Sequence, residues 1–285
     1  MPGVFRAMLC LFCGIVMQAV AGEMSGCLIE PNQTVGLGSP VTGLLEEVVV
    51  RRADRVAKGQ VVARLESRAE KAASELARFK SVQTGPTSMA ESKITFSRKK
   101  FSRRNAMAQE KVMSIQASDD AKAELEIAQA ELKVAQENRQ IAGLEYQQQK
   151  GLLDLRTLRS PFAGVVVEQV AYPGEVVEPG KGAILKLAQL DPLRVQVVLH
   201  KSAFGKVAPQ MQVEVVPEIP VDGRYTAKVR SVDRLIDAAS GTFVVILELP
   251  NPDLRIPAGV TCKARFPDSV VPSKAQPAKA PSVKP

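Results

Sequence analysis

The sequence contains one short pattern twice, and this internal repeat limits the possible folds more than any other feature. Residues 39–59 (SPVTGLLEEVVVRRADRVAKG) and residues 160–180 (SPFAGVVVEQVAYPGEVVEPG) align without a gap. In each copy a Ser-Pro pair is followed by a Gly, an apolar run rich in Val, an acidic turn and a second Gly. Such runs are typical of strands, and the glycines suit tight turns. Neither copy could bury its apolar face alone, so the repeat predicts two half-motifs that close into one small β-sandwich.

Residues 67–157, which separate the two copies, have the composition of helices, with much Ala, Glu, Gln, Lys and Leu. From Ser118 onward, apolar residues recur with the 3-4 spacing of a coiled-coil seam. The seam residues are Ala121, Leu125, Ala128, Leu132, Ala135, Ala142, Tyr146 and Leu153. A second stripe beside them consists of Ile127, Ala130, Val134, Ile141 and Leu144. We expect one stripe to contact a partner helix and the other a neighbouring subunit.

The helical region divides into two equal arms if its tip lies near residues 107–114. Each arm then has about 39 residues and spans roughly 58 Å. Gly85-Pro86 should break or kink the first arm, because Pro clashes with the preceding helical turn. Opposite charges should face each other across the closed hairpin and help to set its register. These charges are Arg98, Lys99, Lys100, Arg103 and Arg104 on one arm, and Asp119, Asp120, Glu124 and Glu126 on the other.

The N-terminus has the features of an export signal. Arg6 supplies a positive charge, residues 7–20 are largely apolar, and Ala19-Val20-Ala21 fits a cleavage site of the A-x-A type. The apolar stretch is short for a membrane span, although an uncleaved signal could still anchor the chain to the inner membrane. We therefore expect the protein to be exported.

The cysteines allow more than one interpretation. Cys10 and Cys13 would leave with the signal, so the mature chain keeps Cys27 and Cys262. In an oxidising compartment these two could form a disulfide, or they could be two separate buried thiols. Met24-Ser25-Gly26-Cys27 could also be a degenerate lipoprotein site, which would place a lipid on Cys27.

The chain after Leu190 alternates short apolar runs with turns that contain Pro and Gly, which is typical of a small β-barrel. The expected strands are residues 193–199, 212–217, 225–232, 242–249 and 260–266.

The predicted fold class is therefore α+β and elongated: a split lipoyl-like β-sandwich with an inserted α-helical coiled-coil hairpin, followed by a small β-barrel. The expected divisions are a signal peptide (1–21), an N-terminal strand segment with the first half-motif (22–66), the hairpin (67–157), the second half-motif (158–190), the barrel (191–266) and a Pro-, Ala- and Lys-rich disordered tail (267–285).

Composition and motifs argue against several functions. The net charge is +8, but the basic residues are scattered or lie opposite acidic residues, so we expect no nucleic-acid partner. His200 is the only His, and the one Cys-x-x-Cys pattern lies in the signal, so we expect no metal site. Phosphate-binding loops of the GxxxxGK type and GxSxG elbows are absent from the sequence. We expect neither catalysis nor a cofactor.

A split lipoyl-like motif, interrupted by a coiled-coil hairpin and followed by a β-barrel, resembles the membrane fusion protein (HlyD-like) family. The resemblance covers roughly residues 27–266. It implies a non-enzymatic periplasmic adaptor that links an inner-membrane transporter to an outer-membrane channel for efflux or secretion. It also implies that several copies associate side by side into a ring.

Adaptors of this kind that dock tip-to-tip with the channel share a hairpin-tip pattern: Arg, three residues, Leu, six residues, Ser. Arg103, Met107 and Ser114 have this spacing, with Met replacing Leu. Met keeps a flexible apolar contact of similar size, while Arg and Ser can donate hydrogen bonds to carbonyls of a partner helix tip. The resemblance therefore implies that these three residues dock the channel.

Two other functions remain open on the sequence. A biotin- or lipoate-carrying enzyme subunit would share the half-motifs, but it presents a modifiable Lys where residues 67–157 are inserted here. Neither Met-Lys-Met nor Asp-Lys-Ala occurs in the chain. A structural coiled-coil protein of the envelope would share the hairpin but have no transport partner.

Overall fold

The computed structural model describes residues 24–267 and residue 270. The described chain forms two compact units. Residues 34–188 form the sandwich–hairpin unit, and residues 24–33 together with the described residues after 188 form the barrel unit. The predicted signal peptide and most of the predicted tail lie outside the described residues. Among the helices that are described, none has the length and hydropathy to cross a membrane.

The sandwich–hairpin unit contains the repeated strands expected from the sequence. They are β2 (Gly43–Val48), β3 (Arg55–Val56), β4 (Val61–Leu65), β5 (Thr157–Arg159), β6 (Gly164–Gln169) and β7 (Val176–Val177). β2 and β6 occupy equivalent positions of the repeat, as do β3 and β7. Two longer strands, β1 (Met24–Leu37) and β8 (Leu185–His200), contribute residues to both units.

The two half-motifs exchange their short strands. β3 of the first half pairs antiparallel with β6 of the second, and β7 of the second half pairs with β2 of the first. The main-chain hydrogen bonds repeat the exchange. Leu45 N donates to Glu175 O at 2.8 Å, and the equivalent Val166 N donates to Asp54 O at 3.0 Å. Each half therefore supplies main-chain partners that the other half lacks.

One apolar core lies between the two halves. Its larger members are Leu45, Val56, Val62, Leu65, Leu158, Phe162, Val166, Ile184, Leu185 and Leu187. Ser39 and Ser160, at equivalent positions, are both buried, and the hydroxyl of each donates to the carbonyl two residues further along the chain. Gly59 and Gly180 are also equivalent, and both adopt a positive φ, which glycine tolerates without steric cost. The shared core confirms the predicted split lipoyl-like sandwich.

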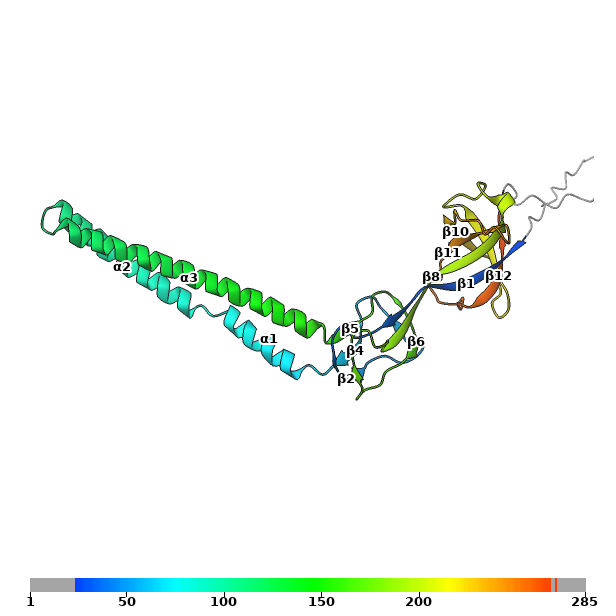
Figure 1. Ribbon diagram of the computed structural model, residues 1–285, viewed down its shortest axis with the longest axis horizontal. Coiled ribbons are helices and arrows are strands. Elements are labelled where there is room, and N and C mark those ends of the chain that lie inside the picture. The colour runs from blue at the N-terminus through cyan, green and yellow to red at the C-terminus, as the bar shows by residue number, and fades with distance from the viewer. Residues whose placement is uncertain (1–23, 268–269, 271–285) are drawn as a thin grey trace, which may run out of the picture. The chain divides into compact units, whose positions relative to one another are not determined.

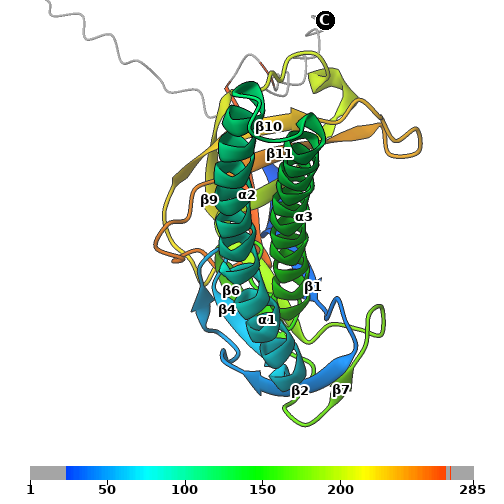
Figure 2. The ribbon, with the colours of Figure 1, turned by 90° about the vertical axis from the view of Figure 1, so that its left-hand side faces the viewer.

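A long helical hairpin fills the sequence between β4 and β5. It consists of α1 (Arg68–Ser81), α2 (Gly85–Gln109) and α3 (Ile115–Asp154). α1 and α2 follow one another along α3 and form one arm, and α3 forms the other (Figures 1 and 2). With 40 residues, α3 is about 60 Å long. The interruption at residues 82–84 directly precedes Gly85-Pro86, which confirms the predicted break, and Pro86 lies in the first turn of α2, where it loses no helical hydrogen bond.

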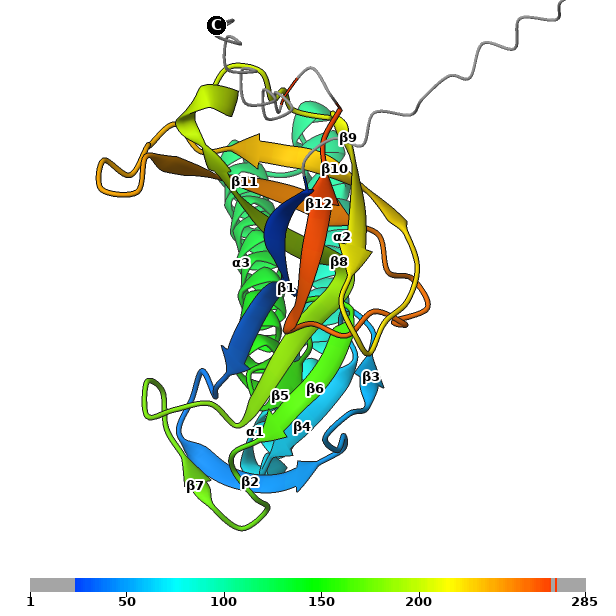
Figure 3. The ribbon, with the colours of Figure 1, turned by 90° about the vertical axis from the view of Figure 1, so that its right-hand side faces the viewer.

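The barrel unit is built on strands that close into a ring. Besides β1 and β8, it contains η1 (Lys201–Ala203), β9 (Gln212–Pro217), β10 (Tyr225–Val232), β11 (Thr242–Leu249) and β12 (Val260–Arg265). Within the described chain, six strands pair in the order β1-β12-β9-β10-β11-β8, and an additional β1–β8 pairing closes the ring. β10 and β11 run across β1 and β12 (Figure 3). This arrangement confirms the predicted β-barrel.

The N-terminal strand belongs with the barrel. The sequence-based division grouped residues 22–66 with the first half-motif, but β1 pairs with β12 from Met24–Arg265 to Ile29–Val260. Ile29 is fully buried in the barrel core. The strands from residues 191–266 alone would leave unpaired edges, and β1 covers them. Residues 24–33 are therefore barrel residues, which corrects that assignment.

Candidate functional site

The hairpin closes in a short turn, residues 110–114, between α2 and α3. The carbonyl of Met107 accepts a hydrogen bond from the N–H of Val112 at 2.9 Å, which holds the turn against the end of α2. Ser114 is the N-cap of α3, and its Oγ accepts a hydrogen bond from the N–H of Ala117 at 3.3 Å. A Ser at this position satisfies one of the free N–H groups of the first helical turn. Two of the three predicted docking residues therefore also shape the turn.

The predicted docking residues lie close to this turn and are exposed. Arg103 and Met107 are one helical turn apart on α2, and Ser114 begins the other arm. The neighbouring Arg104 reaches across the hairpin, and its guanidinium donates to the carbonyl of Ala117 at 3.4 Å. Arg104 thus helps to close the tip, and Arg103 remains available on the outer surface.

Two exposed apolar side chains at the tip were not singled out from the sequence. Val112 is 67% exposed and Ile115 is 73% exposed. They lie in the turn and at the first residue of α3, where helical periodicity gives no information. They could have been identified from the sequence as apolar residues within an otherwise polar turn between the two helical arms. With Met107, they make the tip an apolar surface beside the Arg103 cation.

Burial differs among the predicted seam positions of α3. Ala128 and Ala121 are fully buried. The other positions are half-buried, namely Leu125, Leu132, Ala135, Ala142, Tyr146 and Leu153. The buried residues of the other arm are mostly small or polar, namely Ser74, Ala77, Ala90, Ile94 and Ser97. Small side chains such as Ala128 allow the two arms to approach closely and become fully buried between them. The larger seam side chains stay partly exposed, because two helices alone cannot surround them.

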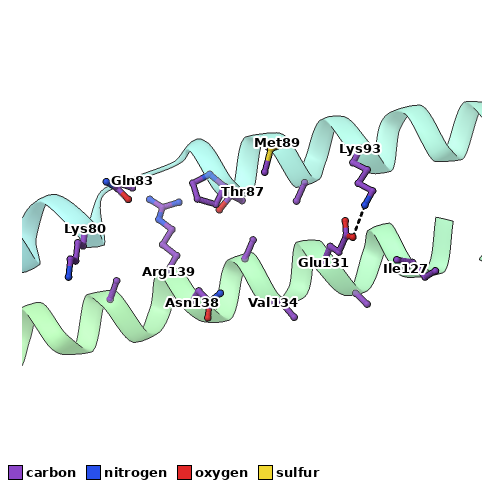
Figure 4. A pocket seen from close by; sticks show the side chains of 15 residues that line it. Lys80, Gln83, Thr87, Met89, Lys93, Ile127, Glu131, Val134, Asn138 and Arg139 are labelled. Carbon is purple, nitrogen blue, oxygen red and sulfur yellow. Dashed lines mark hydrogen bonds and ion pairs between the residues drawn. The ribbon is translucent and has the colours of Figure 1, made fainter. Parts of the chain in front are cut away.

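The second predicted stripe is exposed and borders an open groove. Ile127 and Val134 of α3 and Met89 of α2 line this groove, which has a volume of about 970 Å³. Arg139 occupies the seam position between Ala135 and Ala142 and extends toward the interruption between α1 and α2 (Figure 4). The exposed apolar side chains on this face are 53–73% accessible, namely Met89, Phe96, Ile127, Val134, Ile141 and Leu144.

Ion pairs join the two arms beside the seam. Lys100 Nζ lies 2.6 Å from a carboxylate oxygen of Glu124, a pair expected from the charges of the two arms. This hydrogen bond from Lys100 lowers the pKa of Glu124 below its ordinary value. Lys93 and Glu131 form a second pair at 2.6 Å (Figure 4), which the sequence analysis missed. The sequence could have predicted this pair, because Lys93 and Glu131 lie one heptad further from the tip than Lys100 and Glu124.

Cys27 and Cys262 form a disulfide in the barrel unit. They are directly opposite each other in the β1–β12 register, with Cα atoms 4.8 Å apart, and both are buried. A sulfur atom in a disulfide has no free valence for a thioether. This pairing is therefore incompatible with a lipid on Cys27.

Metal-binding side chains do not gather in the described part of the chain: no group of three or more His, Cys, Asp or Glu residues there could hold an ion. His200 has a local role instead. It is the N-cap of η1, where its Nδ1 accepts a hydrogen bond from the N–H of Ser202 at 3.3 Å.

Comparisons with known proteins agree with this architecture. A family model described as "CzcB-like, barrel-sandwich hybrid domain" matches residues 33–189. The pyoverdine export membrane fusion protein PvdR of Pseudomonas aeruginosa is 23% identical over 208 residues, which cover 72% of this chain and 53% of that protein. The chain thus spans about half the length of the curated relatives it matches.

Two solved structures share the fold. MacA from Actinobacillus actinomycetemcomitans superposes with a TM-score of 0.71 at 22% identity, covering 87% of this chain and 79% of that one. The membrane fusion protein Spr0693 from Streptococcus pneumoniae R6 superposes with a TM-score of 0.57 at 15% identity, covering 86% and 98%. The family match covers more than half of the chain, and it confirms the resemblance inferred from the split repeat. The protein therefore belongs to the family of the CzcB-like barrel-sandwich hybrid domain, and the proteins that it resembles include membrane fusion proteins.

Proposed function

We propose that the protein is a periplasmic adaptor that links an inner-membrane transporter to an outer-membrane channel for efflux or secretion, and that it works without catalysis. The observation that carries the proposal is the hairpin tip. There Arg103, Met107 and Ser114 lie at or near the closed turn that joins the end of α2 to the start of α3. The names of the similar proteins, which include an export membrane fusion protein, support the same assignment.

The chemistry of the tip suits the end of another helical hairpin. A helix C-terminus presents carbonyl groups without intrahelical donors. The Arg103 guanidinium can donate several hydrogen bonds to them, and the Ser114 hydroxyl can donate one while its oxygen caps α3. Met107, Val112 and Ile115 supply apolar contact area around these polar groups.

The sides of the hairpin suit contact with further copies of the same chain. The exposed charges near the tip of α2 are basic (Arg98, Lys99, Arg103), and those of α3 are largely acidic (Asp119, Asp120, Glu126). α2 of one copy would therefore attract α3 of the next when both tips point the same way. Apolar side chains such as Phe96 and Ile127 would be buried in the same contact. A repeated contact of this head-to-tail type closes into a ring when its rotation permits.

Site-specific crosslinking in intact cells tests the docking role. A photoreactive residue at Val112 should capture an outer-membrane protein. Arg103→Asp should abolish the capture, because it reverses the charge offered to the partner carbonyls. Lys150→Asp is the matched control, since it makes the same charge change on an exposed position of α3 far from the tip.

Three outcomes would contradict the docking proposal. Capture that survives Arg103→Asp, or that is lost equally in Lys150→Asp, would show that the partner does not recognise the tip. Recovery of neither a transporter nor a channel would favour a structural coiled-coil protein of the envelope. An added biotin or lipoate in the intact mass of the mature chain would favour a carrier subunit.

A further inference from the structure

The root of the hairpin contains an arginine that contacts three separate segments of the sandwich–hairpin unit. Arg156 lies two residues after the end of α3, in the connection to β5. Its Nη2 donates to Oε1 of Glu70, in the first turn of α1, at 2.5 Å. Its Nη1 donates to the carbonyl of Thr42, just before β2, at 3.0 Å. Both charged side chains are only 22% exposed, so solvent screens this pair less than the ion pairs along the hairpin.

The main chain of Arg156 adds to these contacts. Its carbonyl accepts a hydrogen bond from the N–H of Leu65 at the end of β4, at 2.8 Å. Gly43 leaves the space that the guanidinium needs, because a Cβ there would lie 2.5 Å from Nη1. The same residue thus contacts α1, the residue before β2 and the end of β4.

We propose that Arg156 is a positioning residue that sets the direction of the hairpin relative to the β-sandwich. The chain enters the hairpin after β4 and leaves it before β5, and each connection is only a few residues long. Backbone torsions can turn at both connections unless side chains hold them. The guanidinium opposes such turning because its planar, forked donors hold Glu70 and Thr42 at once.

The lever arm makes this control important. A change of about 10° at the root moves a tip about 60 Å away by about 10 Å. If the position of the tip varies by this distance, only a fraction of the molecules hold the tip where it can bind its partner. This consequence rests on the proposed docking function, whereas the clamp itself is a property of the isolated protein.

Distances measured between two spin labels test the clamp in the full chain. One label is attached to a cysteine at Gln136 on α3, and the other to a cysteine at Lys58 in the sandwich, both exposed positions. Cys10 and Cys13 are replaced by Ser, and the Cys27–Cys262 disulfide stays intact. The unaltered root should give one narrow distance peak. Arg156→Ala should lose that peak in favour of a broad distribution, and Arg156→Lys should broaden it too, because an ammonium lacks the fork that spans both acceptors.

Arg159→Ala is the matched control. Arg159 lies three residues away and donates to the carbonyl of Gly59 within the sandwich, at 3.1 Å. This variant should keep the narrow peak. An unchanged peak in Arg156→Ala, or a distribution already broad with Arg156 present, would overturn the clamp. If the chain with Arg156 intact gives a narrow distance peak but Val112 captures no outer-membrane protein, the result would count against the docking function and leave the clamp standing.

Discussion

Lys100 on α2 and Glu124 on α3 form a bridge across the hairpin in which one ammonium group contacts both carboxylate oxygens, at 2.7 Å and 2.6 Å. The hydrogen bond from Lys100 is the main reason why the pKa of Glu124 falls below its ordinary value of 4.5. The bridge joins the arms near the tip, where the proposed docking residues lie. Its protonation state therefore bears on how firmly the tip is held closed.

The first prediction concerns pH. A carboxyl group whose pKa is lower in the folded than in the unfolded protein stabilises the fold above its ordinary pKa, and this contribution disappears as pH falls through the folded-state value. Helix melting followed by circular dichroism should therefore shift to lower temperature as pH drops below 4.5. Lys100→Gln should reduce the part of this shift that belongs to Glu124. An identical pH dependence in both proteins would contradict the bridge.

The second prediction concerns packing in the seam. Ala128 is fully buried between the arms, so Ala128→Leu should overpack the hairpin and cost about 1–3 kcal/mol of unfolding free energy. Ala123→Leu is the control, because Ala123 is exposed on the same helix and surface substitutions change stability by no more than about 0.5 kcal/mol. Denaturant titration of both variants measures the difference. Equal stability would mean that the arms are not in close contact at Ala128.

The third prediction concerns the disulfide. Cys27→Ala together with Cys262→Ala should lower the stability of the barrel by about 2–4 kcal/mol, because the cross-link restricts the unfolded chain over a long loop. A reductant should destabilise the original protein and leave the double variant unchanged. Fluorescent labels placed separately in the barrel and in the sandwich would follow each unit. A lipid-sized mass on Cys27 in the mature protein would contradict the pairing.

The fourth prediction separates capping from docking at Ser114. Ser114→Ala removes the cap of α3 and should cost about 1 kcal/mol. Ser114→Asp keeps a strong N-cap acceptor, and its negative charge suits the helix N-terminus, so the hairpin should stay stable. Asp cannot donate to a partner carbonyl at neutral pH. The crosslink from Val112 should therefore weaken in both variants, and a normal crosslink in Ser114→Asp would remove Ser114 from the docking surface.

The sequence by itself determined the elements whose information is local or repeated. Ser39 and Ser160 head two copies of one pattern, and the copies pair reciprocally because each has a short strand that only the other can complete. The break at Gly85-Pro86 was equally predictable, since a proline restricts its own backbone and that of the residue before it.

Only the tertiary structure decided how distant segments meet. Cys27 and Cys262 are separated by 235 positions, and no local pattern shows that β1 completes a barrel formed by the other end of the chain. The same is true of Arg156, which looks like an ordinary charge after a helix until Glu70 and Thr42 are brought beside it. Periodicity and turn residues act over a few positions along the chain. Strand partners and side-chain clamps depend on which surfaces remain unpaired after the local elements have formed.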